Sequence, residues 1–198
     1  MSQCVVDTAK LNQSFRDLKN FPANYDREKA FFDAFPSSWM EFVLSYQWYP
    51  NKAYILDYNN HIEAFGNLQF IQDTTYCDKL IFLGVGGKWE ADATSQLQQI
   101  LHSQMNNKTD VFFFRLSLQH RGFQLRFWQF YWSSITLPED NLNRVREDYL
   151  KECELLKRKM GAKYLDEVKT MEIAISYALG EITFSKIENN FPHKYFTK

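Results

Sequence analysis

The feature that most constrains the fold of this chain is a glycine cluster at residues 84–87. Gly84, Gly86 and Gly87 interrupt an apolar run that begins at Leu80. Such a cluster predicts a tight connection, because glycine adopts positive φ at little steric cost and leaves room for close packing. Beyond the cluster, apolar residues recur at helical spacing as far as residue 105. We therefore expect an apolar segment, a sharp joint and then an amphipathic helix.

The lysine that follows the cluster, Lys88, suggests a phosphate-binding loop, but the spacing does not fit one. That motif requires a glycine five positions before the glycine that precedes the lysine, and a serine or threonine after the lysine. Phe82 and Trp89 occupy those two positions. The cluster is therefore interpreted as a structural joint. Glu90 and Asp92 then fall in the first turn of the next helix, where carboxylates complement the helix dipole.

Most of the remaining chain also carries helical periodicity. Helices are predicted over residues 8–19, 26–35, 39–46, 53–66 and 89–105, and two more form a predicted C-terminal hairpin at 136–185. Asp7 as an N-cap, a capping box from Ser38 to Glu41, and Pro36 as a stop support these limits. The predicted fold class is all-α, with one compact domain over residues 1–198 and the hairpin packed on its body.

Two segments leave the choice between helix and strand open. Residues 75–83 are short and apolar, and periodicity does not separate a buried helix from a buried strand there. Residues 111–132 contain nine aromatic side chains, divided by Gly122. Aromatic residues favour strands as well as buried helices. A short β-hairpin at 111–132 is therefore the alternative to a fully helical chain.

Composition argues against several functional classes. The chain has 198 residues, of which 45% are hydrophobic and 17% aromatic, so it can bury a sizeable core. A net charge of −1 gives no field that would attract nucleic acid or an anionic membrane. No apolar run approaches the ~20 residues of a membrane span. The three isolated cysteines argue against a thiolate zinc site, and with the absence of a signal-like N-terminus they predict a cytoplasmic protein.

No pattern in the sequence is typical of catalysis, metal binding or cofactor binding. No two of the four histidines lie three or four residues apart, so no helix face offers a paired metal site. Asp57 and His61 share a helical face and are interpreted as a solvated pair. No catalytic residue, metal or cofactor is assigned. An enzyme with a site built from Asp57, His61 and Glu90 is retained as an alternative.

Two stretches together resemble a known protein family. Residues 31–42 (FFDAFPSSWMEF) are followed about forty residues later by residues 81–93 (IFLGVGGKWEADA), and a Phe-Trp-x-Phe pattern recurs at 127–130. Over roughly residues 28–135 the chain resembles small helical immunity proteins found beside polymorphic and type VI-type secreted toxins in Bacteroidetes. Trp39 departs from the family pattern, which usually has phenylalanine or a smaller residue there. The resemblance implies structural roles for Phe31, Phe35, Pro36, Trp39, Gly86, Gly87 and Trp89.

The resemblance implies a non-enzymatic protein that binds a cognate toxin and neutralises it by steric occlusion. Because the motif residues are then expected in the core, contacts to the toxin are expected from exposed side chains. Lys88, Glu90 and Asp92 are the first candidates, and Asp57 and His61 are added to them. A regulatory or scaffold protein that binds another partner is the main alternative. The sequence leaves the toxin's identity and the oligomeric state open.

Overall fold

The computed structural model describes residues 6–46, 57–88, 93–133 and 139–181, and these ranges contain ten α-helices and no β-strand. In chain order the helices are α1 (Thr8–Asn20), α2 (Tyr25–Ala34), α3 (Trp39–Tyr46), α4 (Tyr58–Gly66), α5 (Asp73–Gly84), α6 (Ala93–Asn107), α7 (Thr109–Ser117), α8 (Arg121–Tyr131), α9 (Glu139–Met160) and α10 (Leu165–Ala178). The prediction of an all-α fold is confirmed. None of the described helices combines the length and the apolar character that crossing a membrane requires.

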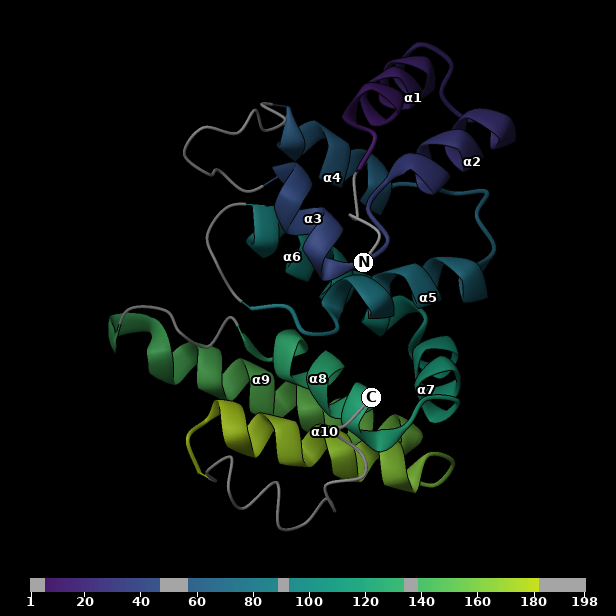
Figure 1. Cartoon of the computed structure of the whole chain (residues 1–198). Coiled ribbons are helices and arrows are strands. Elements are labelled where there is room, and N and C mark those ends of the chain that lie inside the picture. The colour runs from purple at the N-terminus through teal and green to yellow at the C-terminus, as the bar shows by residue number, and fades with distance from the viewer. Residues whose placement is uncertain (1–5, 47–56, 89–92, 134–138, 182–198) are drawn as a thin grey trace.

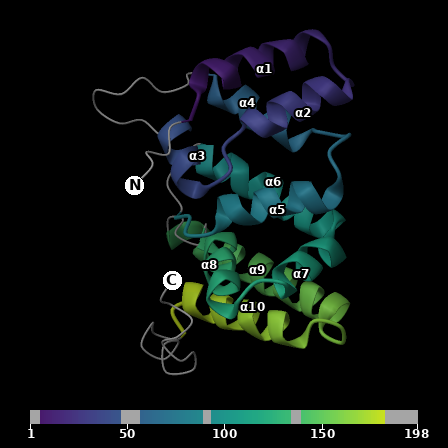
Figure 2. The same cartoon turned by 45° about the vertical axis from the view of Figure 1, so that its right-hand side comes forward.

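The helices are stacked in layers that run from the N-terminal to the C-terminal part of the chain, except that α4 lies with α1 and α2 (Figure 1). Figure 2 shows α1, α2 and α4 at one end, α3, α5 and α6 in the middle, and α7 to α10 at the other end. Helix α1 packs on α2 and α4 packs on α6, whereas α5 packs on α3, α7 and α8. Helix α5 therefore joins the N-terminal layers to the C-terminal ones.

Local capping explains where the first two helices begin and end. The Asp7 carboxylate accepts a hydrogen bond from the Lys10 backbone N–H at 2.9 Å, and the Asn24 side chain accepts one from the Arg27 N–H at 3.1 Å. Each bond satisfies a donor that the first turn of a helix leaves free. At the other end of α2, Phe35 is extended with ψ of 143° because it precedes proline. The predicted limits of both helices are confirmed within a residue or so.

The capping box predicted at the start of α3 is present in a shifted form. The Ser38 hydroxyl accepts from the Glu41 N–H at 3.3 Å, as predicted. The Glu41 carboxylate, however, accepts from the N–H of Ser37 at 2.6 Å rather than from that of Ser38. The two side chains still satisfy two backbone donors at the start of the helix.

The open choices at residues 75–83 and 111–132 are both resolved as helix. Residues 75–83 lie within α5, and the aromatic-rich segment forms α7 and α8 instead of a β-hairpin. The break between α7 and α8 lies at residues 118–120, whereas Gly122 is buried inside α8. His120 is the N-cap of α8, and its side chain accepts from the Phe123 N–H at 3.2 Å.

The glycine cluster is the joint at the end of α5, and it lies against α8. Gly86 has a φ of +78°, a conformation that strongly favours glycine. A Cβ atom on Gly87 would lie 2.4 Å from the Phe130 ring, so only a bare Cα fits there. The Trp39 ring packs on the same phenylalanine with a centroid separation of 5.3 Å. Three of the stretches that carry the family resemblance thus meet around Phe130.

The C-terminal helices α9 and α10 pack against each other, and α10 also packs on α8. An ion pair between Lys157 and Glu172, at 2.6 Å, links the two helices. The Tyr164 ring, between them in sequence, contacts the Phe113 ring at a centroid distance of 5.9 Å. The structure describes the predicted hairpin over residues 139–181, and the remaining residues of the prediction, 136–138 and 182–185, lie outside the described residues.

Candidate functional site

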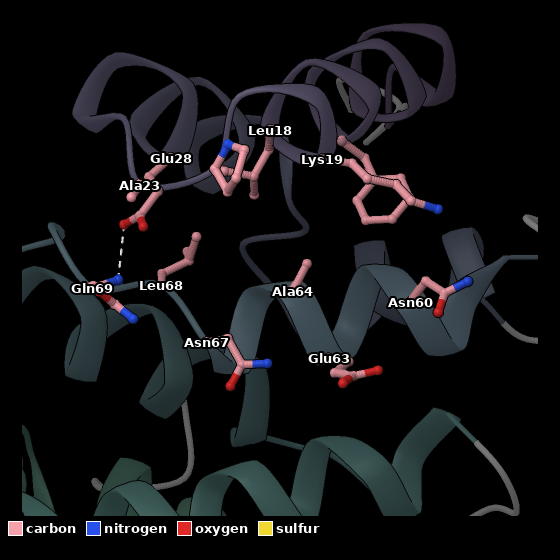
Figure 3. A pocket seen from close by; sticks show the side chains of 12 residues that line it. Leu18, Lys19, Ala23, Glu28, Asn60, Glu63, Ala64, Asn67, Leu68 and Gln69 are labelled. Atoms are coloured by element: carbon pink, nitrogen blue, oxygen red, sulfur yellow. Dashed lines mark hydrogen bonds between the residues drawn. The ribbon is translucent and has the colours of Figure 1, made fainter.

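An open groove runs between α1, α2 and α4 and is closed at one end by the segment that follows α4 (Figure 3). We call it the α1–α4 groove. Its volume is about 400 Å³. Six apolar residues line it: Phe15, Leu18, Pro22, Ala23, Ala64 and Leu68. Six polar residues complete the lining: Lys19, Glu28, Asn60, Glu63, Asn67 and Gln69. A concave surface that combines apolar walls with polar groups is typical of a binding site.

The floor of the groove is anchored in the core of the domain. Leu11, Phe15 and Leu18 recur along one face of α1, and of these Leu11 and Phe15 are buried. The Phe15 ring packs against the imidazole of His61 from α4, with ring centroids 4.3 Å apart. Because the buried imidazole of His61 packs on the Phe15 ring, this ring is fixed in place and forms an apolar base of the groove.

Glu28 supplies the one buried charged side chain in the groove lining. Its side chain is only 4% exposed, although α2 lies at the surface. Its Oε2 atom accepts hydrogen bonds from the backbone N–H groups of Gln69 and Phe70, both at 2.8 Å. These bonds give acceptors to two backbone N–H groups that follow α4. A backbone donor removed from water without an acceptor would cost free energy. Glu28 therefore fixes the end wall of the groove.

Two exposed aromatic residues lie next to the groove in sequence. Phe21 precedes the lining residue Pro22 and is 60% exposed, and Phe70 follows Gln69 and is 46% exposed. The Arg27 guanidinium lies 5.7 Å from the Phe21 ring centroid. Exposed aromatic and arginine side chains beside an apolar groove are typical of protein-binding surfaces.

A second groove, of about 390 Å³, lies on the other side of α4, between α4 and α6. Its lining residues are Ile62, Glu63, Gly66, Asn67, Gln96, Gln99, Ile100, Ser103 and Gln104. Glu63 and Asn67 line both grooves. The exposed face of α4 is thus a ridge between two depressions, and a partner that covers the ridge would contact both.

The predicted contact residue His61 is part of the core. Its side chain is 1% exposed, and its Nδ1 atom lies 3.5 Å from the Tyr46 hydroxyl. Burial lowers the pKa of His61 to about 4, and the nearby Asp57 carboxylate opposes that shift only in part. His61 lines neither groove. The prediction of a solvated Asp57–His61 pair is wrong for His61, because rings from α1, α2 and α3 cover it.

The other predicted contact residues fall in different places. Asp57 is exposed at the N-terminus of α4, where its carboxylate accepts a hydrogen bond from the side chain of the groove residue Asn60. Lys88 is exposed just beyond the glycine joint. Trp89, Glu90 and Asp92 lie outside the described residues. Since His61 is buried, the enzyme alternative built on Asp57, His61 and Glu90 is left without an accessible imidazole.

A polar cluster between α6, α8 and α9 ties those helices together. The Nδ1 atom of His102 lies 3.0 Å from the Glu152 carboxylate, and its Nε2 atom lies 3.1 Å from the Tyr131 carbonyl oxygen. The Tyr131 hydroxyl donates to the same carboxylate at 2.5 Å. The Tyr149 ring stacks on the imidazole with a centroid distance of 5.6 Å. These contacts give the cluster a structural role in joining three helices.

Two cysteines lie among the described residues, and both are buried. Cys77 and Cys153 are buried and unpaired, and burial raises the pKa of each thiol to about 12. Such thiols are poor nucleophiles because the thiolate is the reactive form. Among the described residues, no group of three or more His, Cys, Asp or Glu side chains is arranged to hold a metal ion.

Glu28 and Gln69 were not predicted as site residues. The sequence did contain one signal: Glu28 precedes Phe31, Phe32 and Phe35 at helical spacing, so a carboxylate occupies the apolar face of α2. A charged residue at such a position requires hydrogen-bonding partners in the fold. Those partners are 41 and 42 residues away in the chain, and local patterns do not reveal them.

The described residues thus form an all-helical fold with an open groove between α1, α2 and α4. Comparisons with protein-family models, curated proteins and solved structures found no match to this chain.

Proposed function

We propose that this protein is a cytoplasmic immunity protein that binds a cognate secreted toxin and neutralises it by steric occlusion. The observation that carries the proposal is the α1–α4 groove, with its apolar floor and its flanking exposed aromatic residues. A groove of this kind suits a projecting segment of a protein partner. The resemblance of residues 31–42 and 81–93 to toxin-associated immunity proteins supplies the class of partner.

The surface around α4 extends from the α1–α4 groove to the second groove and so offers a protein partner more than one depression. A stable, specific complex buries roughly 1,200–2,000 Å² in total. The two grooves and the ridge at Glu63 and Asn67 form one continuous candidate surface of α4. Phe21, Phe70 and Arg27 provide the residue types that most often dominate binding energy. A toxin covered over this area would be blocked without any catalytic step.

The test is co-expression with the toxin encoded beside the gene for this protein. The wild-type protein should restore growth and co-purify with the toxin. Ala64→Arg places a long side chain in the groove from the partly exposed wall of α4, and we expect it to abolish both effects. Ala30→Arg is the matched control, because Ala30 is exposed on α2 and lines neither groove.

Two outcomes would refute the proposal. One is a toxin whose toxicity is unaffected by the wild-type protein, with no complex on co-purification. The other is an Ala64→Arg variant that folds and protects as well as Ala30→Arg does, which would show that the groove is not the contact surface. Circular dichroism of both variants checks that each retains the helical fold.

A further inference from the structure

We infer that the partner segment bound in the α1–α4 groove is apolar and carries one lysine or arginine whose cation meets the buried carboxylate of Glu28. This inference rests on the proposed function and specifies the chemistry of the contact. The two carboxylate oxygens of Glu28 differ in their hydrogen bonds. Oε2 accepts two backbone N–H groups, whereas Oε1 has no donor among the described residues. Because Glu28 lines the groove, Oε1 is available to a ligand there.

In the described part of the chain, no basic side chain neutralises the charge of this carboxylate. Within the described ranges no lysine or arginine forms an ion pair with Glu28; Arg27 pairs instead with Asp17 at 3.6 Å, and Lys29 with Asp33 at 2.5 Å. A carboxylate that is 96% buried gains more from a nearby cation than an exposed one does, because less solvent screens the interaction. Because Glu28 lines the groove, its free Oε1 atom is a strong acceptor for a charged donor that enters there.

The other charged groups in the groove modify this preference but do not reverse it. Glu63 adds a second carboxylate to the lining. Lys19 is the basic residue of the lining, and Figure 3 shows it opposite Asn60, at the far end of the groove from Glu28 and Gln69. Lys19 is exposed, so water screens its charge. The end of the groove at Glu28 is therefore the end that favours a cation.

The apolar floor of the groove is the reason why we expect the rest of the bound segment to be apolar. Lysine and arginine side chains lay their aliphatic stems along apolar surface while their charged ends reach a polar group. Leu18, Pro22, Ala23 and Leu68 provide such a surface beside Glu28. A volume of about 400 Å³ holds one such side chain together with an apolar neighbour. An acidic segment, whose ionised carboxylates only accept hydrogen bonds, would give neither the apolar floor nor Oε1 a side-chain partner.

Glu28→Gln tests the inference with little change in shape. The amide oxygen of glutamine can still accept from the N–H groups of Gln69 and Phe70, while its NH₂ group replaces Oε1 and repels a cation. Asp26→Asn is the matched control, because it removes the same charge from an exposed position on the same helix. We expect Glu28→Gln to weaken the toxin complex about tenfold or more, the effect of a charge-assisted hydrogen bond. Asp26→Asn should leave the affinity unchanged.

A second measurement needs no toxin. Hexylamine, hexanol and hexanoate are titrated separately into the wild-type protein, and the backbone amide signals of Gln69 and Phe70 are followed by NMR. We expect hexylamine to bind severalfold more tightly than the other two, and Ala64→Arg and Glu28→Gln to remove that preference. Equal binding of hexylamine and hexanoate would overturn the inference.

The outcomes separate this inference from the proposed function. A toxin complex that forms and is unaffected by Glu28→Gln would overturn the inference and leave the immunity function standing. No toxin complex, together with Glu28-dependent binding of hexylamine, would overturn the immunity function and support the cation preference of the groove. The melting temperature of Glu28→Gln, compared with that of Asp26→Asn, shows whether the fold is retained.

Discussion

Replacing Gly87 by alanine tests the packing at the glycine joint. A Cβ atom at this position would lie 2.4 Å from Cδ2 and 2.8 Å from Cε2 of Phe130. Carbon atoms in favourable contact lie about 3.5–4.0 Å apart, so something must move. Phe130 is fully buried, and its ring packs on Trp39 at 5.3 Å, which restricts its movement. The added methyl group therefore strains the core between α5 and α8.

The expected cost is about 2 kcal/mol, within the range of one to three for an overpacked core. For a domain of this length that corresponds to a fall in Tm of about 4–8 °C. Gly86→Ala is the control, since nothing lies within 4 Å of a Cβ atom there and only the φ of +78° opposes it. Its cost is expected to be about 1 kcal/mol and to come from the backbone.

A double-mutant cycle with Phe130→Ala distinguishes the two causes. Alanine removes Cγ, Cδ2 and Cε2 of Phe130, the three atoms nearest the new methyl group, so Gly87→Ala should cost less than about 0.5 kcal/mol in that background. Gly86→Ala should cost the same in both backgrounds. Free energies of unfolding come from urea titrations followed by far-ultraviolet circular dichroism. Equal costs of Gly87→Ala with and without the Phe130 ring would refute the explanation by packing.

Three further predictions concern charged and polar groups. Burial lowers the pKa of His61 to about 4, so between pH 6.5 and pH 4 the unfolded chain binds a proton more readily than the folded one. His61 therefore lowers the free energy of unfolding as the pH falls, by at most about 1.4 kcal/mol per pH unit. The variant His61→Phe should flatten that slope in urea titrations. The bidentate contact between Arg115 and Asp78, at 2.6 and 2.5 Å, should give a coupling of about 1 kcal/mol in an Ala double-mutant cycle, and less in 1 M salt. Glu152→Gln should cost about 1–3 kcal/mol, because the Tyr131 hydroxyl donates to this carboxylate, and thermal melts measure the loss.

Each of these predictions has a result that would contradict it. If His61→Phe leaves the pH dependence unchanged, other groups carry it. A coupling near zero between Arg115 and Asp78 would show that solvent screens this half-buried pair. Glu152→Gln with wild-type stability would mean that the amide replaces the carboxylate at no cost to the hydrogen bonds.

Helices that are buried along one face could be predicted from the sequence, and those buried on several faces could not. Helix α1 repeats Leu11, Phe15 and Leu18 on one side and polar residues on the other, so its period is visible in the sequence. Helix α5 buries Cys77, Leu80 and Ile81 against several neighbours, and its apolar residues do not form a single stripe. For the same reason the aromatic residues of α7 and α8 fitted a strand as well as a helix. The residues that pack against these two segments decide that they are helices and not strands.

The residues of the candidate site could be predicted from the sequence less well than the helices could, because their surroundings depend on tertiary structure. Asp57 and His61 share a face of α4 whatever surrounds the helix, but the sequence did not show that other helices cover His61. Glu28 was visible as a charge on an apolar face, yet its partners Gln69 and Phe70 lie more than forty residues away.

The sequence by itself determined the helices whose ends carry local caps, the helical class of the fold and the joint at Gly86 and Gly87. Each of these follows from backbone conformation and from contacts between residues a few positions apart. Only the tertiary structure decided which faces are covered, and hence that His61 is buried while the groove beside Glu28 remains open. The physical reason is that burial and hydrogen-bond satisfaction are set by contacts between helices distant in the chain, which no local pattern records.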